Sequence, residues 1–324
     1  MKKIHIISTL IGLLAFSTLA KADLKVVTSI KPIHSLASYI MDGVGSPGLI
    51  VDGYNSPHSF QLKPSHAKML EQADIIFWIG EDLENFLEKP LATIAKKAEK
   101  IELLEIKGIK KLKFRERNIF EEHEGHDDHG DDAKKEEHDD HGHDAKKEEY
   151  DDHEGHGHGE YDPHIWLDPI NAKVILSEIT EHLIENDSKN ASTYKSNLAN
   201  ALAKIDKLII DVITETNTDL NYVVFHDAYQ YYENRFNVNI LGAMTVNPDV
   251  MPGAEQIHEI HEVIEHDNVS CILSEPQFNP DIIKSIAKDT NVKTGVLDPL
   301  GANIKPGKDL YFDLIRNMSA SFNC

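Results

Sequence analysis

Residues Ile75–Ile79 read IIFWI, five large apolar side chains in succession. A strand with one face in water alternates apolar and polar residues, whereas a strand buried on both faces has no polar position. Helical patterns flank the run, one from Pro64 to Ala73 and one over Leu87–Ala98 with Pro90 as a break or restart. A buried strand between two helices predicts an α/β fold with a parallel sheet covered by helices.

The same alternation of strand and helix extends outward on both sides of this run. Further strands are predicted at Leu24–Ser29, Leu49–Val51, Tyr222–Phe225, Val238–Leu241, Cys271–Leu273 and Lys293–Leu297. Further helices are predicted at Pro32–Ile40, Ala172–Ile184, Tyr229–Phe236, Ala254–Ile264, Asp281–Asp289 and Leu310–Phe322. We therefore expect two (β/α)4-like lobes with parallel sheets.

A long helical pattern separates the two blocks. It runs from about Asn190 to Thr216, contains no Gly or Pro and, at about 1.5 Å per residue, would be roughly 40 Å long. We interpret it as a linking helix that touches both lobes. A chain of 324 residues has room for two domains. We expect an N-terminal lobe at 23–189, the linking helix at 190–217 and a C-terminal lobe at 218–324.

The first residues have the pattern of an export signal. Met1–Lys3 is a short positive start, Ile4–Leu19 is mostly apolar, and Ala20–Ala22 has the A-x-A form of a cleavage site. We predict a secretory signal peptide at 1–22, cleaved near Ala22–Asp23. The alternative is a transmembrane anchor, but the run is short for a bilayer span and contains Ser and Thr. No direct membrane insertion is expected.

The chain contains two cysteines, Cys271 and Cys324. Disulfides persist in oxidising compartments, so an exported chain with two cysteines is expected to join them. The bond would tie a predicted core strand to residue 324 and, in the chain-entropy model, add roughly 3–4 kcal/mol of stability. The alternative is two free buried thiols, because the sequence does not show whether the geometry permits a bond.

Residues Glu121–Glu160 form a tract rich in histidine and acid. It contains nine histidines and eighteen carboxylates, and His126–Glu137 (HDDHGDDAKKEE) is repeated at His138–Glu149 (HDDHGHDAKKEE) with one change. Such a segment lacks the apolar surface that offsets the entropy of ordering, so we predict a disordered insertion in the first lobe. Its imidazoles and carboxylates are ligands for divalent metals, and weak zinc binding is expected. The predicted weak ligands are His123, His126, His129, His138, His141, His143, His153, His156 and His158.

The negative charge of the chain is concentrated in this tract. The formal net charge is −22, and the tract contributes 4 lysines and 18 acids, or −14, which leaves −8 for the rest. No basic stripe or basic amphipathic helix accompanies it. Neither nucleic-acid binding nor a membrane-surface role is therefore expected.

Three histidines outside the tract lie where a metal site is expected. His58 is in the loop NSPHSF, His164 is in DPHIW, and His226 directly follows the apolar strand YVVF. In open α/β sheets ligands bind off the carboxyl ends of the strands, and all three residues can lie there. Each taken singly is more often a hydrogen-bonded structural histidine, but the three together, beside the tract, favour a metal site. Three neutral imidazoles and one oxygen make a tetrahedral zinc site.

The sequence leaves the fourth ligand open. Asp298, in VLDPLG after the last predicted strand, is the best protein candidate, and water is its rival. Glu275 and Asp227 are weaker candidates. A carboxylate such as Asp162, Asp168 or Asp227 is expected to accept the second ring N–H of an imidazole and to orient it.

His258 and His261 form a separate pair, spaced i, i+3 on one predicted helix. Residues three apart lie on the same helix face, so the pair could share a weak second ion with the tract. The simpler interpretation is an exposed polar helix face.

Five segments together resemble one protein family. They are VDGYNSPHSFQLKPS from Val51, DPHIWLDP from Asp162, VFHDAYQYYENRF from Val224, SEPQF from Ser274 and LDPLGANI from Leu297. In this order, with the His-rich insertion and two late cysteines, they resemble the periplasmic zinc-binding protein of bacterial high-affinity zinc ABC importers, the ZnuA type. The resemblance covers almost all of the mature chain. It implies two (β/α)4 lobes joined by one long helix, with metal held between them by His58, His164 and His226.

Two positions refine what the resemblance implies. Similar manganese and iron binders have a carboxylate where this chain has His226, and nitrogen in place of that oxygen favours zinc. Several zinc-binding members have Glu immediately before the first ligand histidine, where this chain has Pro57. A carboxylate from that position is absent here, which raises the weight on Asp298 or water.

The function implied is that of a receptor, not an enzyme. We expect a periplasmic monomer that captures Zn²⁺ and delivers it to the inner-membrane permease of an ABC importer with its ATPase. One alternative is a receptor of the same family for manganese or another divalent metal. A zinc-dependent hydrolase is another, since three histidines and water also occur in catalytic sites, but H-E-x-x-H and G-x-S-x-G motifs are absent. The last alternative is a metal buffer or sensor centred on the tract.

Overall fold

The computed structural model describes residues 23–324 except 116, 121–158 and 249. The strands of this part form two four-stranded sheets in which all neighbouring strands are parallel. The first sheet has the order β2-β1-β3-β4 and consists of β1 (Val26–Ile30), β2 (Gly48–Val51), β3 (Ile75–Trp78) and β4 (Glu99–Glu102). The second has the order β6-β5-β7-β8 and consists of β5 (Asn221–His226), β6 (Asn239–Thr245), β7 (Val269–Ser274) and β8 (Lys293–Val296). The predicted α/β fold with two parallel-sheet lobes is confirmed.

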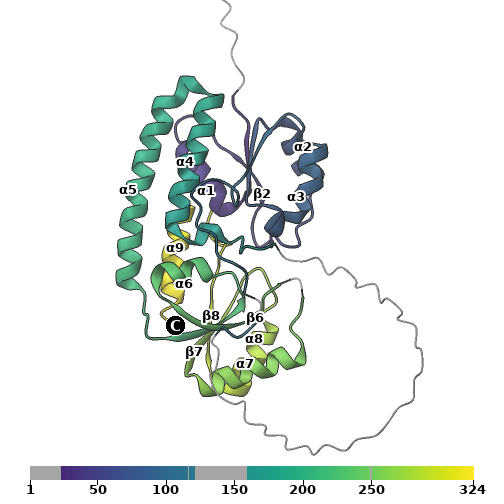
Figure 1. The fold of residues 1–324 in the computed structure, drawn as a ribbon, viewed down its shortest axis with the longest axis vertical. Coiled ribbons are helices and arrows are strands. Elements are labelled where there is room, and N and C mark those ends of the chain that lie inside the picture. Colours follow the sequence, from purple (N-terminus) through teal and green to yellow (C-terminus); the bar gives the residue numbers. More distant parts are fainter. Residues whose placement is uncertain (1–22, 116, 121–158, 249) are drawn as a thin grey trace, which may run out of the picture.

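Helices connect and cover these strands in the described residues. They are α1 (Lys31–Ile40), α2 (Pro64–Gln72), α3 (Glu81–Thr93), α4 (Pro169–Asn186), α5 (Ala191–Glu215), α6 (Gln230–Phe236), α7 (Ala254–His266), α8 (Asp281–Thr290) and α9 (Leu310–Ser321). Short 3₁₀ segments at Ile165–Leu167 and Ser188–Asn190 precede α4 and α5. Figure 1 shows one lobe above the other, with α5 running beside both.

The central strands are buried on both faces. All four residues of β3 are buried, as the IIFWI run predicted, and all five of β1 are buried as well. In the second sheet β5 occupies the corresponding place and buries five of its six residues. Removing these side chains from water on both faces contributes to the apolar core of each lobe.

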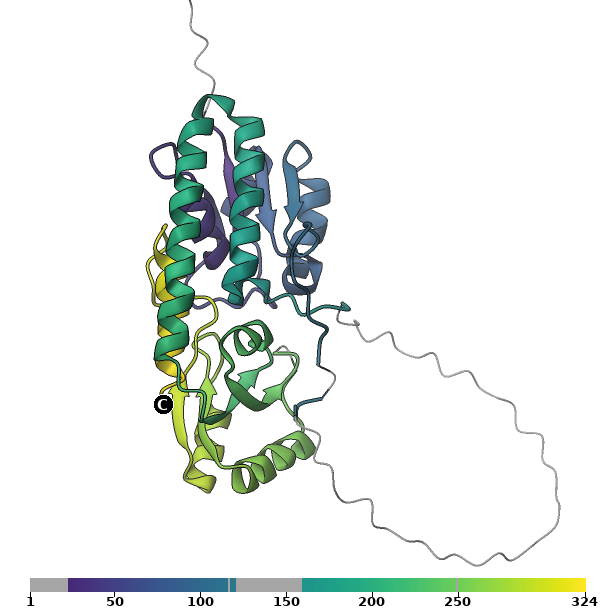
Figure 2. The same ribbon diagram turned by 60° about the vertical axis from the view of Figure 1, so that its left-hand side comes forward.

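Helix α5 is the predicted linking helix, and it runs along the first lobe and reaches the upper part of the second (Figure 2). It packs against α4 and α1 and, further along, against α9. α9 follows the second sheet in sequence but also packs on α1, where Tyr311 N donates to Ser35 Oγ at 2.9 Å. Helices α5 and α9 therefore both contact elements of the two lobes on one side of the molecule. The buried face of α5 consists of Tyr194, Ala201, Ile205, Leu208 and Val212.

The helix predicted over Leu87–Ala98 has the wrong bounds. α3 runs from Glu81 to Thr93 with Pro90 inside it, and residues 99–102 form β4, which was not predicted. β4 is an edge strand of sequence EKIE in which Ile101 is the buried residue. Charged side chains are common on edge strands, and they remove the apolar run that marks a strand in sequence.

Residues Asn118–Phe120 cross from the first lobe to the second sheet, which the sequence did not predict. Ala243 N donates to Asn118 O at 2.8 Å, and the segment pairs antiparallel to the edge strand β6. A Cβ at Gly242 would lie 2.7 Å from the Asn118 carbonyl oxygen, so this close approach requires glycine. The chain thus reaches the second lobe before the tract, and after the tract Tyr161 pairs with Lys113.

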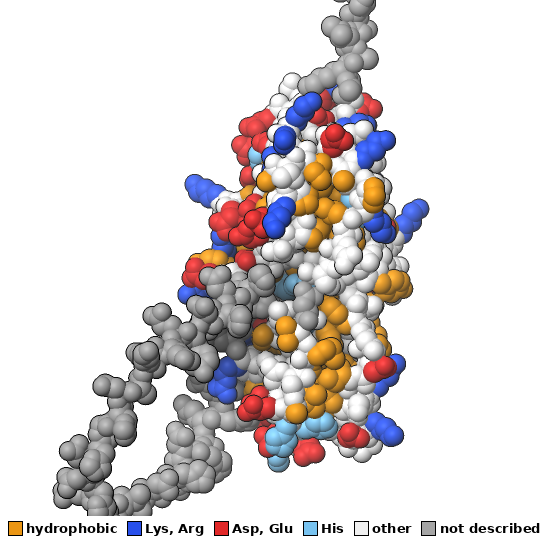
Figure 3. Space-filling view, turned by 90° about the vertical axis from the view of Figure 1, so that its right-hand side faces the viewer, with side chains coloured by type: hydrophobic (Ala, Val, Ile, Leu, Met, Phe, Trp, Pro, Cys, Tyr) orange, Lys and Arg blue, Asp and Glu red, His pale blue; other side chains and the backbone are white. Residues whose placement is uncertain are grey.

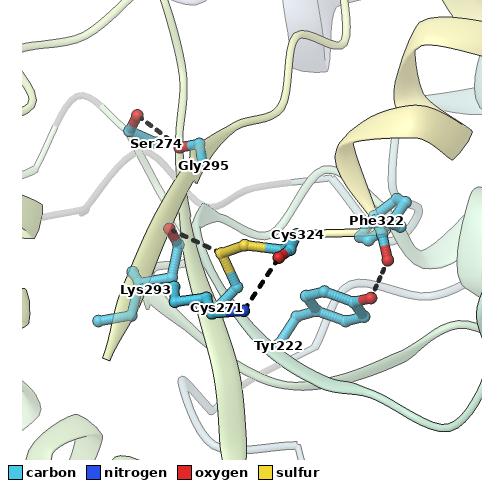
Figure 4. Close-up of a disulfide and its surroundings, with 8 residues drawn as sticks. Tyr222, Cys271, Ser274, Lys293, Gly295, Phe322 and Cys324 are labelled. Atoms are coloured by element: carbon cyan, nitrogen blue, oxygen red, sulfur yellow. Dashed lines mark hydrogen bonds between the residues drawn. A yellow bond between two sulfur atoms is a disulfide. The ribbon is translucent and has the colours of Figure 1, made fainter. Parts of the chain in front are cut away.

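Cys271 in β7 and Cys324 form the predicted disulfide, with their Cα atoms 6.3 Å apart (Figure 4). The sequence separation is 53 residues, for which the chain-entropy model gives about 4 kcal/mol of stabilisation. Beside the bond, Tyr222 OH donates to the Phe322 carbonyl oxygen. Both contacts attach the segment after α9 to the core of the second lobe.

Candidate metal centre

His58, His164 and His226 come together at the junction of the two lobes. His58 lies in the loop after β2, His164 directly precedes the 3₁₀ segment Ile165–Leu167, and His226 is the last residue of β5. One ligand nitrogen from each histidine lies within 4.8 Å of the other two. The structure thus gathers three nitrogen donors that are far apart in the sequence.

Buried carboxylates orient two of the three rings. Asp162 Oδ1 is 2.7 Å from Nδ1 of His164, and Glu275 Oε1 is 2.6 Å from Nδ1 of His226. Each carboxylate accepts the Nδ1–H, so each ring keeps the lone pair of its Nε2 atom available. The two Nε2 atoms lie 3.4 Å apart. Two lone pairs directed at one point form a pair of donors that a single cation can bridge.

Burial and neighbouring charge shift these two imidazoles in opposite directions. Burial lowers the pKa of His164 well below its ordinary value, and the nearby His226 adds to the shift. Burial acts on His226 in the same direction, but the charge and hydrogen bond of Glu275 outweigh it and raise the pKa of His226. A proton shared by this pair is therefore held by His226 in preference to His164, and a cation binding at the two Nε2 atoms would compete with it.

The three imidazoles face a small pocket to which both lobes contribute. Pro57 and Trp166 line it from the first lobe, and Phe278, Pro299 and Leu300 line it from the second. The cavity volume that the centre of a water molecule can occupy is about 10 Å³, which is room for about one water molecule or ion. Apolar walls keep the local dielectric low and strengthen the contact between a cation and its ligands.

Asp298 is not brought into the group of three histidines. Its Oδ1 accepts Gln277 Nε2 at 2.9 Å and the N–H groups of Leu300 and Gly301 at 3.1 and 2.9 Å. Its Oδ2 accepts Ala302 N at 2.6 Å. Both oxygens are therefore engaged in holding the loop that follows β8, and Asp298 is not one of the residues that line the pocket.

Two of the carboxylates expected to orient an imidazole pair with arginines instead. Asp168 caps the start of α4 and binds Arg235 through both oxygens, at 2.7 and 2.8 Å. Asp227 accepts Arg115 Nη1 at 2.9 Å, and the same guanidinium binds Glu233. Burial raises the pKa of Asp227 and of Glu233 to about 7, against the lowering effect of Arg115. A partly buried cluster of Arg115, Asp227 and Glu233 therefore starts at the residue that follows His226.

Glu275 has a role that the sequence analysis missed. It was considered a weak candidate for a ligand, whereas in the structure it lines the pocket and orients His226. The signal that could have found it is its position directly after β7, the neighbour of β5, because adjacent parallel strands end side by side.

The pair His258 and His261 lies on the surface of the second lobe. Figure 3 shows histidine and acidic side chains gathered at the lower end of the molecule, where α7 lies. His258 is exposed, and its Nε2 is 3.5 Å from Glu262 Oε1. In the described part of the chain neither histidine belongs to a group of three donors close enough to share an ion. The arrangement agrees with the simpler interpretation of an exposed polar face.

Two predicted features fall outside the described residues. These are the signal peptide at 1–22 and the weak zinc ligands of the tract, from His123 to His158. Among the residues that are described, no helix combines the length and the apolar character needed to cross a membrane.

Two parallel-sheet lobes with histidines converging between them define a two-lobed α/β protein with a candidate metal centre at the lobe junction. The chain belongs to the family described as zinc-uptake complex component A, periplasmic (ZnuA), whose family model matches residues 26–323. It is 45% identical over 312 residues to the high-affinity zinc uptake system protein ZnuA of Brucella abortus (strain 2308), covering 94% of this chain and 92% of the relative. The protein of the same name from Yersinia pestis is 37% identical over 308 residues, which cover 93% and 91% of the two chains.

Solved structures confirm the fold. A crystal structure of ZnuA superposes with a TM-score of 0.69 at 20% identity, covering 93% of this chain and all of the other. A mutant of the laminin-binding adhesin Lmb of Streptococcus agalactiae gives a TM-score of 0.71 at 21% identity, covering 93% and 98%. A Mn-bound periplasmic metal-binding protein of Candidatus Liberibacter asiaticus gives 0.68 at 20% identity, covering 92% and 97%. The family resemblance inferred from five sequence segments is confirmed, and the family is one of solute-binding receptors for zinc import.

Proposed function

We propose that this chain is a periplasmic zinc receptor that binds one Zn²⁺ ion through His58, His164 and His226. One observation carries the proposal: three imidazole nitrogens within 4.8 Å of one another face a pocket with room for about one ion. Nitrogen donors at such spacing match the preference of zinc for imidazole in a tetrahedral site. The orienting carboxylates Asp162 and Glu275 support the same assignment.

We assign the fourth position to water in preference to Asp298. A ligand role for Asp298, which does not line the pocket, would require its carboxylate to turn away from N–H groups that it now accepts. Those bonds hold the loop after β8, so their loss would also disturb the pocket wall at Pro299 and Leu300. A water molecule fills the fourth position without this cost.

Zinc is favoured over the alternative cargoes by the donor set. Manganese prefers carboxylate and carbonyl oxygen, and three neutral nitrogens suit zinc better. The hydrolase alternative is disfavoured because the chain lacks the H-E-x-x-H and G-x-S-x-G motifs. The family of receptors to which the chain belongs gives no support to an enzyme.

Export and delivery complete the proposal. The signal peptide at 1–22 would be removed in the periplasm, where the monomer passes zinc to the inner-membrane permease of an ABC importer with its ATPase. The relatives' names, high-affinity zinc uptake system protein, support this partner. We assign residues 23–189 and 218–324 to the two lobes and 190–217 to the linking helix. The tract at 121–160 would be an accessory that collects zinc weakly.

The site is tested by metal binding to the purified full chain. Wild type, His164→Ala and the exposed control His266→Ala are loaded with one equivalent of Zn²⁺ and titrated against a chromophoric chelator. Co²⁺ loading adds a spectroscopic check, because tetrahedral nitrogen-rich cobalt sites absorb visible light strongly. Removal of one of three protein ligands should abolish the tight site in His164→Ala and leave it intact in His266→Ala. Retention of the tight site and of the cobalt spectrum in His164→Ala would show that the ion is bound elsewhere.

A further inference from the structure

Lys31 makes a buried contact between the lobes. It is the first residue of α1, directly after β1, and it is 2% exposed. Its Nζ donates to the carbonyl oxygens of Gly301, Ala302 and Ile304 at 2.5, 3.0 and 2.8 Å. The acceptors lie about 270 residues further along, in the loop that follows β8 of the second lobe. All three N–H bonds of one ammonium group are thus used to hold one loop of the other lobe.

The same loop is fixed through its N–H groups by Asp298. The carboxylate accepts the N–H of each residue from Leu300 to Ala302. The carbonyls of this loop point to Lys31, and Gly301 takes the left-handed conformation, with φ of 70°, that the tight turn needs. The Asp298 carboxylate within the loop and the Lys31 ammonium group from the first lobe therefore determine the conformation of the loop together.

This loop is also a wall of the metal pocket. Pro299 and Leu300 line the pocket together with the three histidines. The Pro299 carbonyl oxygen accepts Trp166 Nε1 at 2.8 Å, and the Trp166 ring lies 5.3 Å from that of His164. A displacement of this loop would therefore move the pocket wall that lies beside the three histidines. Lys31 and Trp166 hold this wall from the first lobe, and Tyr54 OH adds a hydrogen bond to Asn303 Oδ1 in the same loop.

We propose that Lys31 is the latch that holds the second-lobe wall of the pocket against the first lobe and thereby sets the rate at which bound zinc is released. The part that concerns zinc rests on the proposed function. Release requires the loop that carries His58 and the loop that carries Pro299 and Leu300 to separate. Separation breaks the three charge-assisted hydrogen bonds between the ammonium group and the loop carbonyls, so Lys31 opposes it. Lys31 is a positioning residue, because it acts on the ion through the wall.

The chemistry of the latch requires an ammonium group. Three carbonyls that converge on one point match the three donors of Lys, whereas the planar fork of Arg presents its donors in different directions. Burial lowers the pKa of Lys31, while the neighbouring Asp52 and Asp298 oppose this shift. A neutral side chain of the same length, as in Lys31→Met, would fill the space and leave the carbonyls of Ala302 and Ile304 without this donor.

The experiment compares Lys31→Met with Lys308→Met in the full chain. Lys308 Nζ forms an exposed ion pair with Asp42 Oδ2 at 2.5 Å, also between the first and second halves of the chain. Lys308→Met therefore removes the same charge and leaves the contacts of Lys31 intact. The zinc-loaded proteins are mixed with excess chelator, and the slow phase that His164→Ala abolishes is taken as release from the pocket. Hydrogen exchange at the amides of Leu300–Ala302 is measured without metal.

The latch predicts about tenfold faster release in Lys31→Met than in Lys308→Met, the factor for the loss of roughly one charge-assisted hydrogen bond. The cobalt spectrum should match wild type, since the ligands are untouched, and exchange at Leu300–Ala302 should accelerate. Release within twofold of the control, or unchanged exchange, would overturn the proposal. If wild type bound no zinc at the histidines, the proposed function would fail, and the exchange in metal-free protein would still decide the latch. If Lys31→Met lacks the wild-type circular dichroism spectrum, the same two measurements on Lys31→Arg decide it, with faster release and exchange than wild type expected.

Discussion

Replacing Glu275 by Gln tests how far the metal centre depends on the carboxylate behind His226. The Oε1 atom of Glu275 accepts the Nδ1–H of His226 at 2.6 Å, and the residue is 3% exposed. The glutamine side chain would keep an oxygen at this position and remove the charge. The free energy of a hydrogen bond to a charged group is about 1.5–3 kcal/mol, and that of a neutral one is about 0.5–1.5 kcal/mol. The difference of roughly 1.4 kcal/mol corresponds to about tenfold weaker zinc binding, at the low end of the range for such partners.

The pH dependence gives this substitution a second signature. Glu275 raises the pKa of His226 in the metal-free protein, so proton and zinc compete for His226 from above its ordinary value of 6.5. In Glu275→Gln the pKa of His226 falls, and proton competition begins at a lower pH. Both proteins lose zinc affinity as the pH decreases, but wild type begins to lose it first. The ratio of the two dissociation constants should therefore be largest at about pH 8 and smaller at about pH 6.

The assay is competition with a chromophoric chelator over this pH range, with Glu265→Gln as the control. Glu265 lies exposed on α7, so its substitution changes the net charge by the same amount away from the pocket. A Glu275→Gln affinity within twofold of this control would refute the orienting role of the carboxylate. A ratio that increases on acidification would refute the assignment of the competing proton to His226.

Three further predictions test the fold and the tract. Changing Cys271 and Cys324 together to Ser should lower the free energy of unfolding by about 4 kcal/mol in urea titration, and an unchanged midpoint would contradict the chain-entropy estimate. Deleting 121–158 should leave one tight zinc site by calorimetry and remove weaker binding, whereas loss of the tight site would favour the buffer alternative. On α5, Ile205→Ala should cost about 2–5 kcal/mol because the side chain is fully buried. Ile210→Ala, at a position 65% exposed, should cost less than about 0.5 kcal/mol, and equal losses would contradict the observed helix orientation.

The parts of the fold that the sequence predicted are those in which burial alone determines residue type. β3 and β5 are central strands, and their apolar runs follow directly from having helices on both faces. β4 has one neighbouring strand and a charged sequence, so local pattern does not mark it. The pairing of Asn118–Phe120 with β6 depends on contacts between residues that are more than 120 positions apart, such as Asn118 Nδ2 with the Ala243 carbonyl. No local periodicity encodes such a pairing.

The candidate metal centre likewise has a part that the sequence predicted and a part that it did not. His58, His164 and His226 were predicted as ligands because each can lie at a strand carboxyl end and because they accompany the His-rich tract, and the structure brings their nitrogens within 4.8 Å of one another. The roles of Glu275 and Asp298 were not separable from sequence, since each is an acid that follows a strand of the second sheet. Asp298 turns to the N–H groups of its own loop and Glu275 turns to an imidazole, and that difference depends on side-chain direction in the folded chain.

The packing of α9 on α1 makes completion of the first lobe depend on the last part of the chain. Ser35 precedes Tyr311, which it contacts in the native protein, by 276 residues. Before α9 has docked, the side of α1 that meets α9 is uncovered, so the partly folded first lobe presents apolar surface such as the ring of Tyr39, which lies 5.6 Å from that of Phe312 in the native protein. A chain truncated before α9 should accordingly fail to complete its first lobe and be degraded.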